Sequence, residues 1–210
     1  PTYKLVNESE SDVTCIITLT KDLKVEIKEK GDVGSQANPI TDWETLSQLL
    51  MGNSTNEEVT LYVAGEFHVS STLQMYSPAN IIPVGDVEFT RGKDVDDGDF
   101  SGFMFQHEGA MKLALGSEAG IITFSEDEVQ IGSTFIDSSA ESLTLTNCVF
   151  QNSLDGTEDI RIRGSATAVY LNGTINIGNI FFSFSEVTPI YVGNLSADSL
   201  IGITLSEPEN

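Results

Sequence analysis

Basic residues are scarce in this sequence of 210 residues, which holds 10 Lys and Arg against 32 Asp and Glu. The formal net charge of -22 repels phosphate backbones and anionic membrane surfaces, and no Lys/Arg cluster is dense enough to reverse it locally. We therefore expect no nucleic-acid partner. Because hydrophobic residues still make up 40%, the composition is that of a folded chain. The acidity is explained by the solubility of a β-rich surface protein, with collection of divalent cations as the alternative explanation.

Cysteines and long apolar runs are scarce as well. Cys15 and Cys148 lie far apart in alternating apolar runs, so we expect two free, inert thiols. No run of ~18 apolar residues could span a membrane, and no signal peptide opens the chain at Pro1, so we expect no membrane insertion of this segment. Since both ends are polar, we expect a part of a longer protein, with any leader or anchor outside it.

Helical periodicity occurs at one place, directly after a Gly/Asn/Pro-rich stretch at residues 31–39 that predicts a boundary. Its apolar stripe consists of Trp43, Leu46, Leu49 and Leu50. Thr41 or Asp42 is suited to cap the start, and Gly52-Asn53 is suited to a left-handed cap at the end. We expect residues 1–35 to be N-terminal strands or the tail of a preceding domain, and residues 36–210 to form the main domain.

From Val59 onward, short segments with a period of two follow one another, separated by turn residues. The absence of a second helical pattern excludes a βαβ architecture and leaves a sandwich, a barrel or a β-solenoid. The sequence therefore predicts an all-β chain.

Internal similarity favours the solenoid. The segment that starts at Ser142 aligns without a gap with the segment that starts at Thr174, as apolar, x, apolar, x, Asn, x, x, Phe. This alignment predicts that Leu143 stacks on Ile175 and Asn147 on Asn179, a strand spacing of ~4.8 Å apart, with both asparagines at corners. Further copies are predicted for the following residues: Leu113 and Leu115 one unit earlier, and Leu200 to Leu205 as a degenerate last copy. The expected fold is a right-handed parallel β-helix, with the short helix at Trp43 covering its N-terminal end.

A longer stretch resembles a known family. The segments DWETLSQLL, VTLYVAGEFHVSSTLQM, IIPVGDVEFTRG and FMFQHEGAMKLAL resemble the opening of the pectin-lyase-like superfamily of parallel β-helices, most of all the bacterial surface and adhesin types similar to polymorphic outer membrane proteins. The resemblance covers roughly residues 36–126, and the remainder matches only in its repeat character. It implies the fold more than an activity.

The catalytic elements of the superfamily's enzymes are absent. Neither the Trp-Ile-Asp-His nor the Arg-x-Pro-x-x-Arg stretch of pectate-lyase-like enzymes occurs, and of the polygalacturonase-like elements only Arg161-Ile162-Arg163 resembles one. His68 and His107 match no catalytic element. We therefore favour a protein without enzymatic activity.

One cluster keeps an enzymatic alternative open. Asp155, Asp159, Arg161 and Arg163 lie close together, with Glu158 between them, and the two arginines share one face of a predicted strand. They would be the catalytic residues of a polysaccharide lyase or glycosidase. Ion pairs on an acidic surface are the more common use of such a cluster.

A second cluster of carboxylates suggests calcium. Asp94, Asp96, Asp97 and Asp99 lie within six residues and include the hard oxygen ligands that Ca²⁺ requires, without the spacing of an EF-hand. A solvated acidic loop is favoured, with weak calcium binding as the alternative, and no other cofactor is indicated.

These observations predict a secreted or cell-surface β-helix protein, adhesin-like or structural, that presents a binding face to a glycan or to a host or cell-surface protein. The alternatives are a carbohydrate-active enzyme on the same fold and a purely structural filament or surface-layer component. Neither the ligand nor the oligomeric state follows from the sequence.

Overall fold

The computed structural model describes residues 15–19, 25–29, 31–52, 57–94, 98–99, 102–108, 112–127, 134–151, 158–164, 167–183 and 189–205. In chain order the elements are β1 (Cys15–Leu19), β2 (Val25–Glu29), α1 (Trp43–Met51), β3 (Val59–Val69), β4 (Leu73–Met75), β5 (Ala79–Asp94), β6 (Gly98–Asp99), β7 (Phe105–His107), β8 (Lys112–Gly116), β9 (Ile122–Asp127), β10 (Ile136–Ser138), β11 (Ser142–Gln151), β12 (Ile160–Ile162), β13 (Ala168–Phe182), β14 (Ile190–Leu195) and β15 (Leu200–Leu205). The protein is mostly β, as the sequence predicts. The expected boundary at residue 35 stays a prediction.

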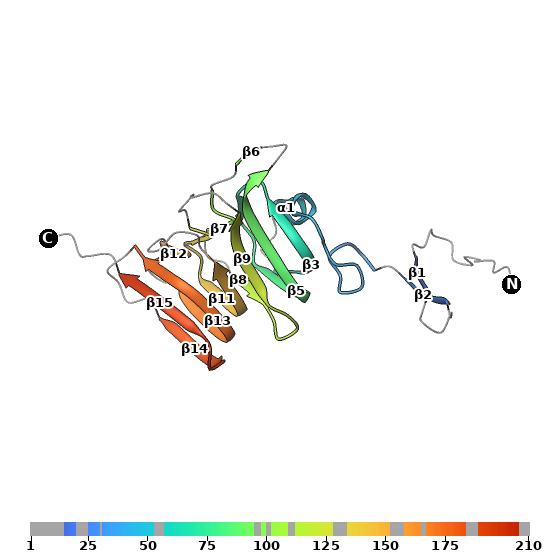
Figure 1. Ribbon diagram of the computed structural model, residues 1–210. Helices are drawn as coiled ribbons and strands as arrows, with labels where there is room; N and C mark the ends of the chain where they lie inside the picture. The colour runs from blue at the N-terminus through green and yellow to red at the C-terminus, as the bar shows by residue number, and fades with distance from the viewer. Residues whose placement is uncertain are drawn as a thin grey trace.

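Two sheets account for the strands. β1 and β2 form an antiparallel pair, and the other thirteen strands form one hydrogen-bonded network, parallel except for the short pairing of β5 with β6. Figure 1 shows β3, β5, β9, β11, β13 and β15 side by side in chain order, with α1 beside β3. Each main strand therefore pairs with a strand that follows it in the sequence.

The pairings sort into three ladders, which the chain visits in the same order six times; we call each visit a pass. The first ladder contains residues 59–63, 79–83, 112–116, 142–146, 168–172 and 190–195. The second contains residues 65–69, 87–91, 122–126, 148–151, 175–177 and 200–201. The third contains residues 73–75, 105–107, 136–138, 160–162, 180–182 and 203–205.

The core follows from the alternation within each ladder, because every second side chain points inward. In the second ladder the inward position is phenylalanine in four successive passes: Phe67, Phe89, Phe124 and Phe150. Their ring centroids are 4.7, 5.6 and 4.6 Å apart. Phe124 thus stacks between Phe89 and Phe150, and Phe67 lies tilted on Phe89, which stabilises the pairing of passes beyond the burial of area.

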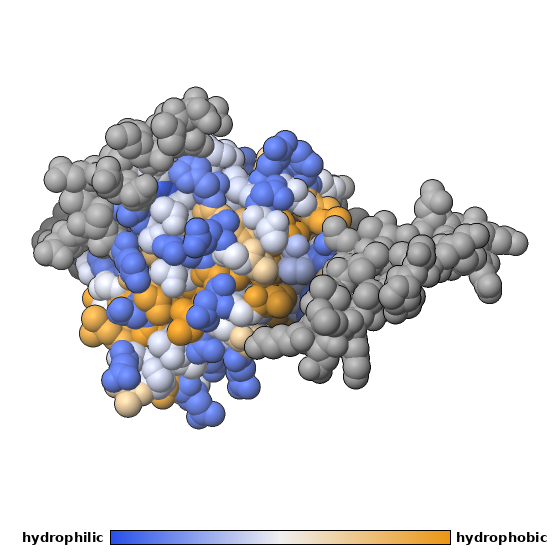
Figure 2. Space-filling model, turned by 45° about the vertical axis from the view of Figure 1, so that its right-hand side comes forward, coloured by the Kyte–Doolittle hydropathy of each residue, from blue (hydrophilic) through white to orange (hydrophobic). Residues whose placement is uncertain are grey.

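Apolar residues also reach the surface. Figure 2 shows a largely hydrophilic face that is interrupted by apolar areas. Among the described residues the exposed large hydrophobics include Val84 on β5 and Tyr170 on β13, and four lie on the last two strands, namely Tyr191, Val192, Leu200 and Ile203. The C-terminal strands therefore differ from the rest of the sheet.

The predicted register of two segments is wrong by one ladder. Leu143 pairs with Leu113 and Val169, whereas Ile175 pairs with Cys148. The predicted equivalence of Leu113 and Leu143 is correct. Because the first and second ladders of one pass have the same apolar alternation, a gapless alignment placed a segment of the first ladder on one of the second.

Helix α1 lies where the sequence predicts. The Asp42 carboxylate caps it by accepting a hydrogen bond of 2.8 Å from the backbone N–H of Thr45. Trp43 packs edge-on against Phe89 and Phe105, with centroids 6.0 and 5.5 Å apart, and α1 contacts β3 and β4. The helix therefore covers the strands of the first pass.

One detail of the helix prediction is wrong. Leu49 is 38% exposed, because it lies at the edge of the stripe that Trp43, Leu46 and Leu50 bury. Gly52 ends the helix in the right-handed region (φ -72°), with its N–H donating to the Gln48 carbonyl. Asn53, the other residue of the predicted left-handed cap, lies outside the described residues, so that cap stays a prediction. Within the described residues, no helix is long and apolar enough to cross a membrane.

Candidate functional site

The outward side chains of the first ladder change in size along the stack. At one outward position the successive residues are Asn80, Ala114, Thr144, Tyr170 and Tyr191. Smaller side chains therefore precede two large aromatic ones. A hollow of about 530 Å³ lies where the side chains change in size, between Thr144 and Tyr170. Its lining consists of Lys112, Glu141, Ser142, Thr144, Ala168, Tyr170 and Asn172.

The aromatic wall of this hollow is the ring of Tyr170, which stacks on Tyr191. Tyr170 and Tyr191 have centroids 4.7 Å apart and an interplanar angle of 12°. They are 38% and 51% exposed, so both phenols face solvent. Since Tyr191 covers one face of Tyr170, the ring's other face is directed toward Thr144 and the hollow.

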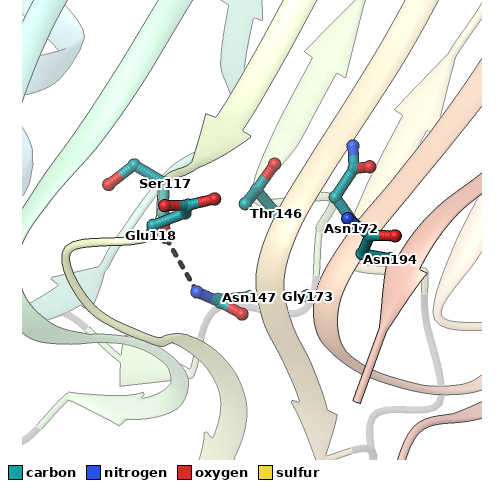
Figure 3. A pocket seen from close by; sticks show the side chains of 7 residues that line it. All are labelled: Ser117, Glu118, Thr146, Asn147, Asn172, Gly173 and Asn194. Carbon is teal, nitrogen blue, oxygen red and sulfur yellow. Dashed lines mark hydrogen bonds between the residues drawn. The ribbon is translucent and has the colours of Figure 1, made fainter.

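A second hollow, of about 400 Å³, adjoins the first at Asn172. Figure 3 shows the residues that line it, which are polar except for one glycine: Ser117, Glu118, Thr146, Asn147, Asn172, Gly173 and Asn194. Together the two hollows form a polar groove with one aromatic wall across four successive passes, which we call the first-ladder groove.

Asn147 fixes the corner at the floor of this groove. Its side-chain N–H donates to the Ser117 carbonyl at 2.9 Å, and its side-chain oxygen accepts from the Thr174 N–H at 2.7 Å. Its φ of 52° lies in the left-handed region, which asparagine tolerates better than most residues. Asn147 therefore joins the preceding and the following pass through one amide, as expected for a corner asparagine.

The asparagines do not stack on each other as predicted. The oxygen of Asn147 lies over Gly173, where a Cβ would come within 2.1 Å of it. Asn179 lies at the corner between the second and third ladders, where its N–H donates to Asp159 at 3.2 Å. Both residues are at corners, but at different ones.

The arginines of the predicted catalytic cluster pair with carboxylates of this chain. Arg161 binds Glu158 at 2.7 Å, and Arg163 binds Asp137 at 2.7 Å and Glu108 at 3.0 Å. These two carboxylates, Asp137 first, raise the pKa of Arg163. A bound anion would have to compete with these carboxylates for the guanidinium groups.

The carboxylates of that cluster are placed differently. Asp159 is 2% exposed, and one of its oxygens accepts hydrogen bonds from the backbone N–H groups of Gly178 and Asn179 at 2.6 and 3.2 Å. It therefore ties the third ladder to the next pass. Asp155 lies outside the described residues.

The predicted calcium ligands are only partly described. The backbones of Asp94 and Asp99 belong to the antiparallel pairing of β5 with β6, and Asp96 and Asp97 lie outside the described residues. In the part of the chain that the structure describes, no three His, Cys, Asp or Glu side chains are grouped as metal ligands. Calcium binding stays a prediction.

A buried ion pair was not predicted from the sequence. Arg91 and Glu126 are in register in the second ladder, and both side chains are fully buried. Arg91 also donates to the carbonyls of Gly102 and Thr134, both at 2.9 Å, and lies 4.3 Å over the ring of Phe135. Burial lowers the pKa of Arg91 and the contact with Glu126 opposes that shift. The pair anchors the chain segments that lead into the third ladder.

Two other titratable groups are buried in the core. Burial lowers the pKa of His107 from 6.5 to about 4, against an opposing contact with the Ser77 backbone. Burial raises the pKa of Cys148 to about 12, and this cysteine is a free thiol, as expected. The side chain of Cys15 lies outside the described ones. Neither His107 nor Cys148 reaches the first-ladder groove.

The stacked pair of Tyr170 and Tyr191 was also missed. The signal was present in the sequence, because AVYLNG and PIYVGN both place tyrosine between two apolar residues, with Asn and Gly following. That recurrence at a spacing of 21 residues corresponds to one pass, from Tyr170 to Tyr191.

Comparison with protein-family models, curated proteins and solved structures finds no match to this chain.

Proposed function

We propose that the three ladders are the faces of a right-handed parallel β-helix of the pectin-lyase-like type, closed at its first pass by α1. In-register parallel pairing in six successive passes supports this proposal. The aromatic stack from Phe67 to Phe150 supports it as well, since equivalent side chains of successive passes lie on one another. The right-handed sense of the β-helix is inferred from the general rule that about 98% of parallel crossover connections are right-handed.

We propose further that this β-helix is a non-enzymatic secreted or cell-surface protein, adhesin-like, and that the first-ladder groove binds a glycan. The observation that carries this proposal is the placement of the half-exposed ring of Tyr170 beside amide and hydroxyl side chains. The C–H face of a sugar packs against an aromatic ring, while its hydroxyls exchange hydrogen bonds with Asn and Thr.

Charge narrows the class of glycan. Lys112 is a cation that lines the groove, but Glu141 lines the same hollow and Glu118 lines the adjoining one, and the whole chain has a net charge of -22. Acidic glycans would be repelled over distances of about a Debye length. The groove is therefore best suited to a neutral oligosaccharide, whose recognition depends on stacking and hydrogen bonds.

The test is an array of neutral and acidic oligosaccharides, followed by calorimetry on the best ligand. We expect neutral members to bind, and we expect Tyr170→Ala to weaken this binding about tenfold or more. A tenfold loss of affinity corresponds to about 1.4 kcal/mol. The matched control is Tyr76→Ala, because Tyr76 is 54% exposed and does not line the groove. Absence of binding across the array, or an equal loss in both variants, would contradict the proposal.

The enzymatic alternative has less support, because Arg161 and Arg163 are held by carboxylates of this chain. It makes a separate prediction. Turnover of polygalacturonate, with or without Ca²⁺, that is lost in Arg161→Ala would favour it over a binding protein.

A further inference from the structure

The ring of Tyr170 fixes the orientation of any ring that packs on it. Its stacking partner Tyr191 is in register on the next strand, with centroids 4.7 Å apart and an interplanar angle of 12°. This distance is close to the spacing of ~4.8 Å between strands, so the two rings stack along the direction in which the passes follow one another. The open face of Tyr170 is therefore directed toward the preceding pass.

The side chains on that side are smaller than a ring. Thr144 is in register with Tyr170 on the preceding strand, and Ala114 is in register with Thr144 one pass earlier. Beside them, Thr146 is in register with Asn172, and Gly116 with Thr146. A sugar ring that packs on Tyr170 can therefore stand over Thr144, in the place that a third aromatic ring of this column would take.

The orientation of this first sugar decides where a second one lies. An equatorial glycosidic bond leaves a sugar at the edge of its ring, so the next unit continues in the same plane. Because the plane of Tyr170 crosses the direction of stacking, that unit lies along the strands. Asn172 follows Tyr170 on the same outward face of β13, and the second hollow adjoins the first there. An axial bond would instead direct the next unit out of this plane.

The second hollow has the chemistry to hold such a unit by hydrogen bonds. None of the described residues that line it is aromatic, and Thr146, Asn172 and Asn194 supply hydroxyl and amide groups. The side-chain oxygen and one N–H of Asn147 are already bound to the backbone of neighbouring passes. The two hollows therefore differ, since one offers a ring for stacking and the other offers polar groups.

We propose that the first-ladder groove recognises two neighbouring sugars of a neutral glycan whose connecting bond is equatorial on both rings. The first sugar continues the stack of Tyr191 and Tyr170 over Thr144, and the second lies farther along the strands, beside Asn172 and Asn194. This inference rests on the proposed function, because it assigns a linkage and a direction to the glycan that the groove binds.

Calorimetry with glucose, cellobiose, maltose and cellotriose tests the linkage. Cellobiose and maltose contain the same two sugars, and their connecting bond is equatorial on both rings only in cellobiose. We expect cellobiose to bind about tenfold or more tightly than glucose or maltose. Cellotriose should gain little more, because its third unit extends beyond both hollows. In Asn194→Ala, cellobiose should lose most of its advantage over glucose.

Thr144→Tyr tests the position of the first sugar, because the new ring would occupy it. We expect cellobiose to bind about tenfold or more weakly, without a loss of stability in urea, since a tyrosine in register extends the stack. The matched control is Thr60→Tyr. Thr60 is exposed and belongs to the same outward column three passes before Thr144, away from the groove, so this variant should bind like the wild type.

Nuclear Overhauser contacts to bound cellobiose give a readout on the wild type. The Thr144 methyl protons should contact one sugar, and the Thr146 methyl protons the other. Contacts of the second sugar with Asn80 in place of Thr146 would mean a chain that runs along the stack, and would overturn the inference.

The inference and the proposed function fail in different ways. The inference alone is overturned if cellobiose does not bind, or binds no better than maltose, while other neutral glycans bind and depend on Tyr170. It is also overturned if Thr144→Tyr leaves the binding of cellobiose intact. Absence of binding across the whole array of glycans overturns both.

Discussion

Substitution of Phe124 by alanine tests whether successive passes are stacked through their aromatic core. Phe124 is fully buried, and its ring centroid lies 5.6 Å from Phe89, 4.6 Å from Phe150 and 6.1 Å from Phe105. Phe→Ala changes in cores cost about 3–5 kcal/mol, and the cost grows with the cavity that remains. Because the rings on both sides are held by backbone pairing, the site cannot collapse, and we expect about 4–5 kcal/mol.

Equilibrium unfolding in urea measures this cost. The midpoint should fall while the slope m stays the same, since the folded structure is otherwise kept. Tyr191→Ala is the control, because Tyr191 is 51% exposed and stacks on one ring only, so its loss should cost about 0.5–1.5 kcal/mol. A cost below about 1.5 kcal/mol for Phe124→Ala, or one equal to that of the control, would refute the stacking of Phe124 between two passes.

Three further predictions concern buried or partly buried polar groups. Unfolding exposes His107, and its pKa then returns from about 4 toward 6.5. Because the unfolded state binds the proton more readily, the free energy of unfolding is not reduced above pH 6.5 and falls by as much as about 3 kcal/mol as the pH drops to 4. His107→Leu should flatten this part of a stability–pH profile, and an unchanged profile would contradict the burial of His107. Arg91→Met should cost about 3–5 kcal/mol in urea unfolding because it leaves a carboxylate buried, and Arg91→Met with Glu126→Leu should recover most of this; a double variant no better than the single would be evidence against the pair. Asn147→Ala should lower the free energy of unfolding by about 2–3 kcal/mol, since two hydrogen bonds to neighbouring passes are lost at a left-handed φ, whereas a loss within about 0.5 kcal/mol would place Asn147 outside the corner.

Features that depend on neighbouring residues were predictable from the sequence. The cap at Asp42 and the buried stripe of α1 follow from spacing within one short segment. The strand segments after Val59 follow from alternation in the same way. In each case the residues that make the pattern also make the contacts.

Register between passes was not predictable by the same means, because the passes differ in length. The first-ladder residues Val59 and Ala79 are 20 residues apart, whereas Ala79 and Leu113 are 34 apart. Since the chain between the second and third ladders varies in length, no fixed period exists. A gapless alignment then matched Leu143 with Ile175, which belong to different ladders.

The site depends on this register, which explains why it was missed. Tyr170 and Tyr191 become a stacked pair, and Arg91 and Glu126 an ion pair, only when passes of unequal length are placed side by side. The cluster of Asp159, Arg161 and Arg163 was found because its members are neighbours in the sequence. Asp137, which binds Arg163, was not included because it comes from the previous pass.

Parallel, in-register stacking of the passes is tested most directly by nuclear Overhauser contacts between residues 142–146 and 168–172. Parallel pairing of Leu143 with Val169 and of Leu145 with Leu171 predicts regularly spaced contacts between amide protons and the Hα protons of the facing strand. Close Hα–Hα contacts in an antiparallel pattern, or contacts from Leu143 to Ile175 in place of Val169, would contradict the stacking and the β-helix with it.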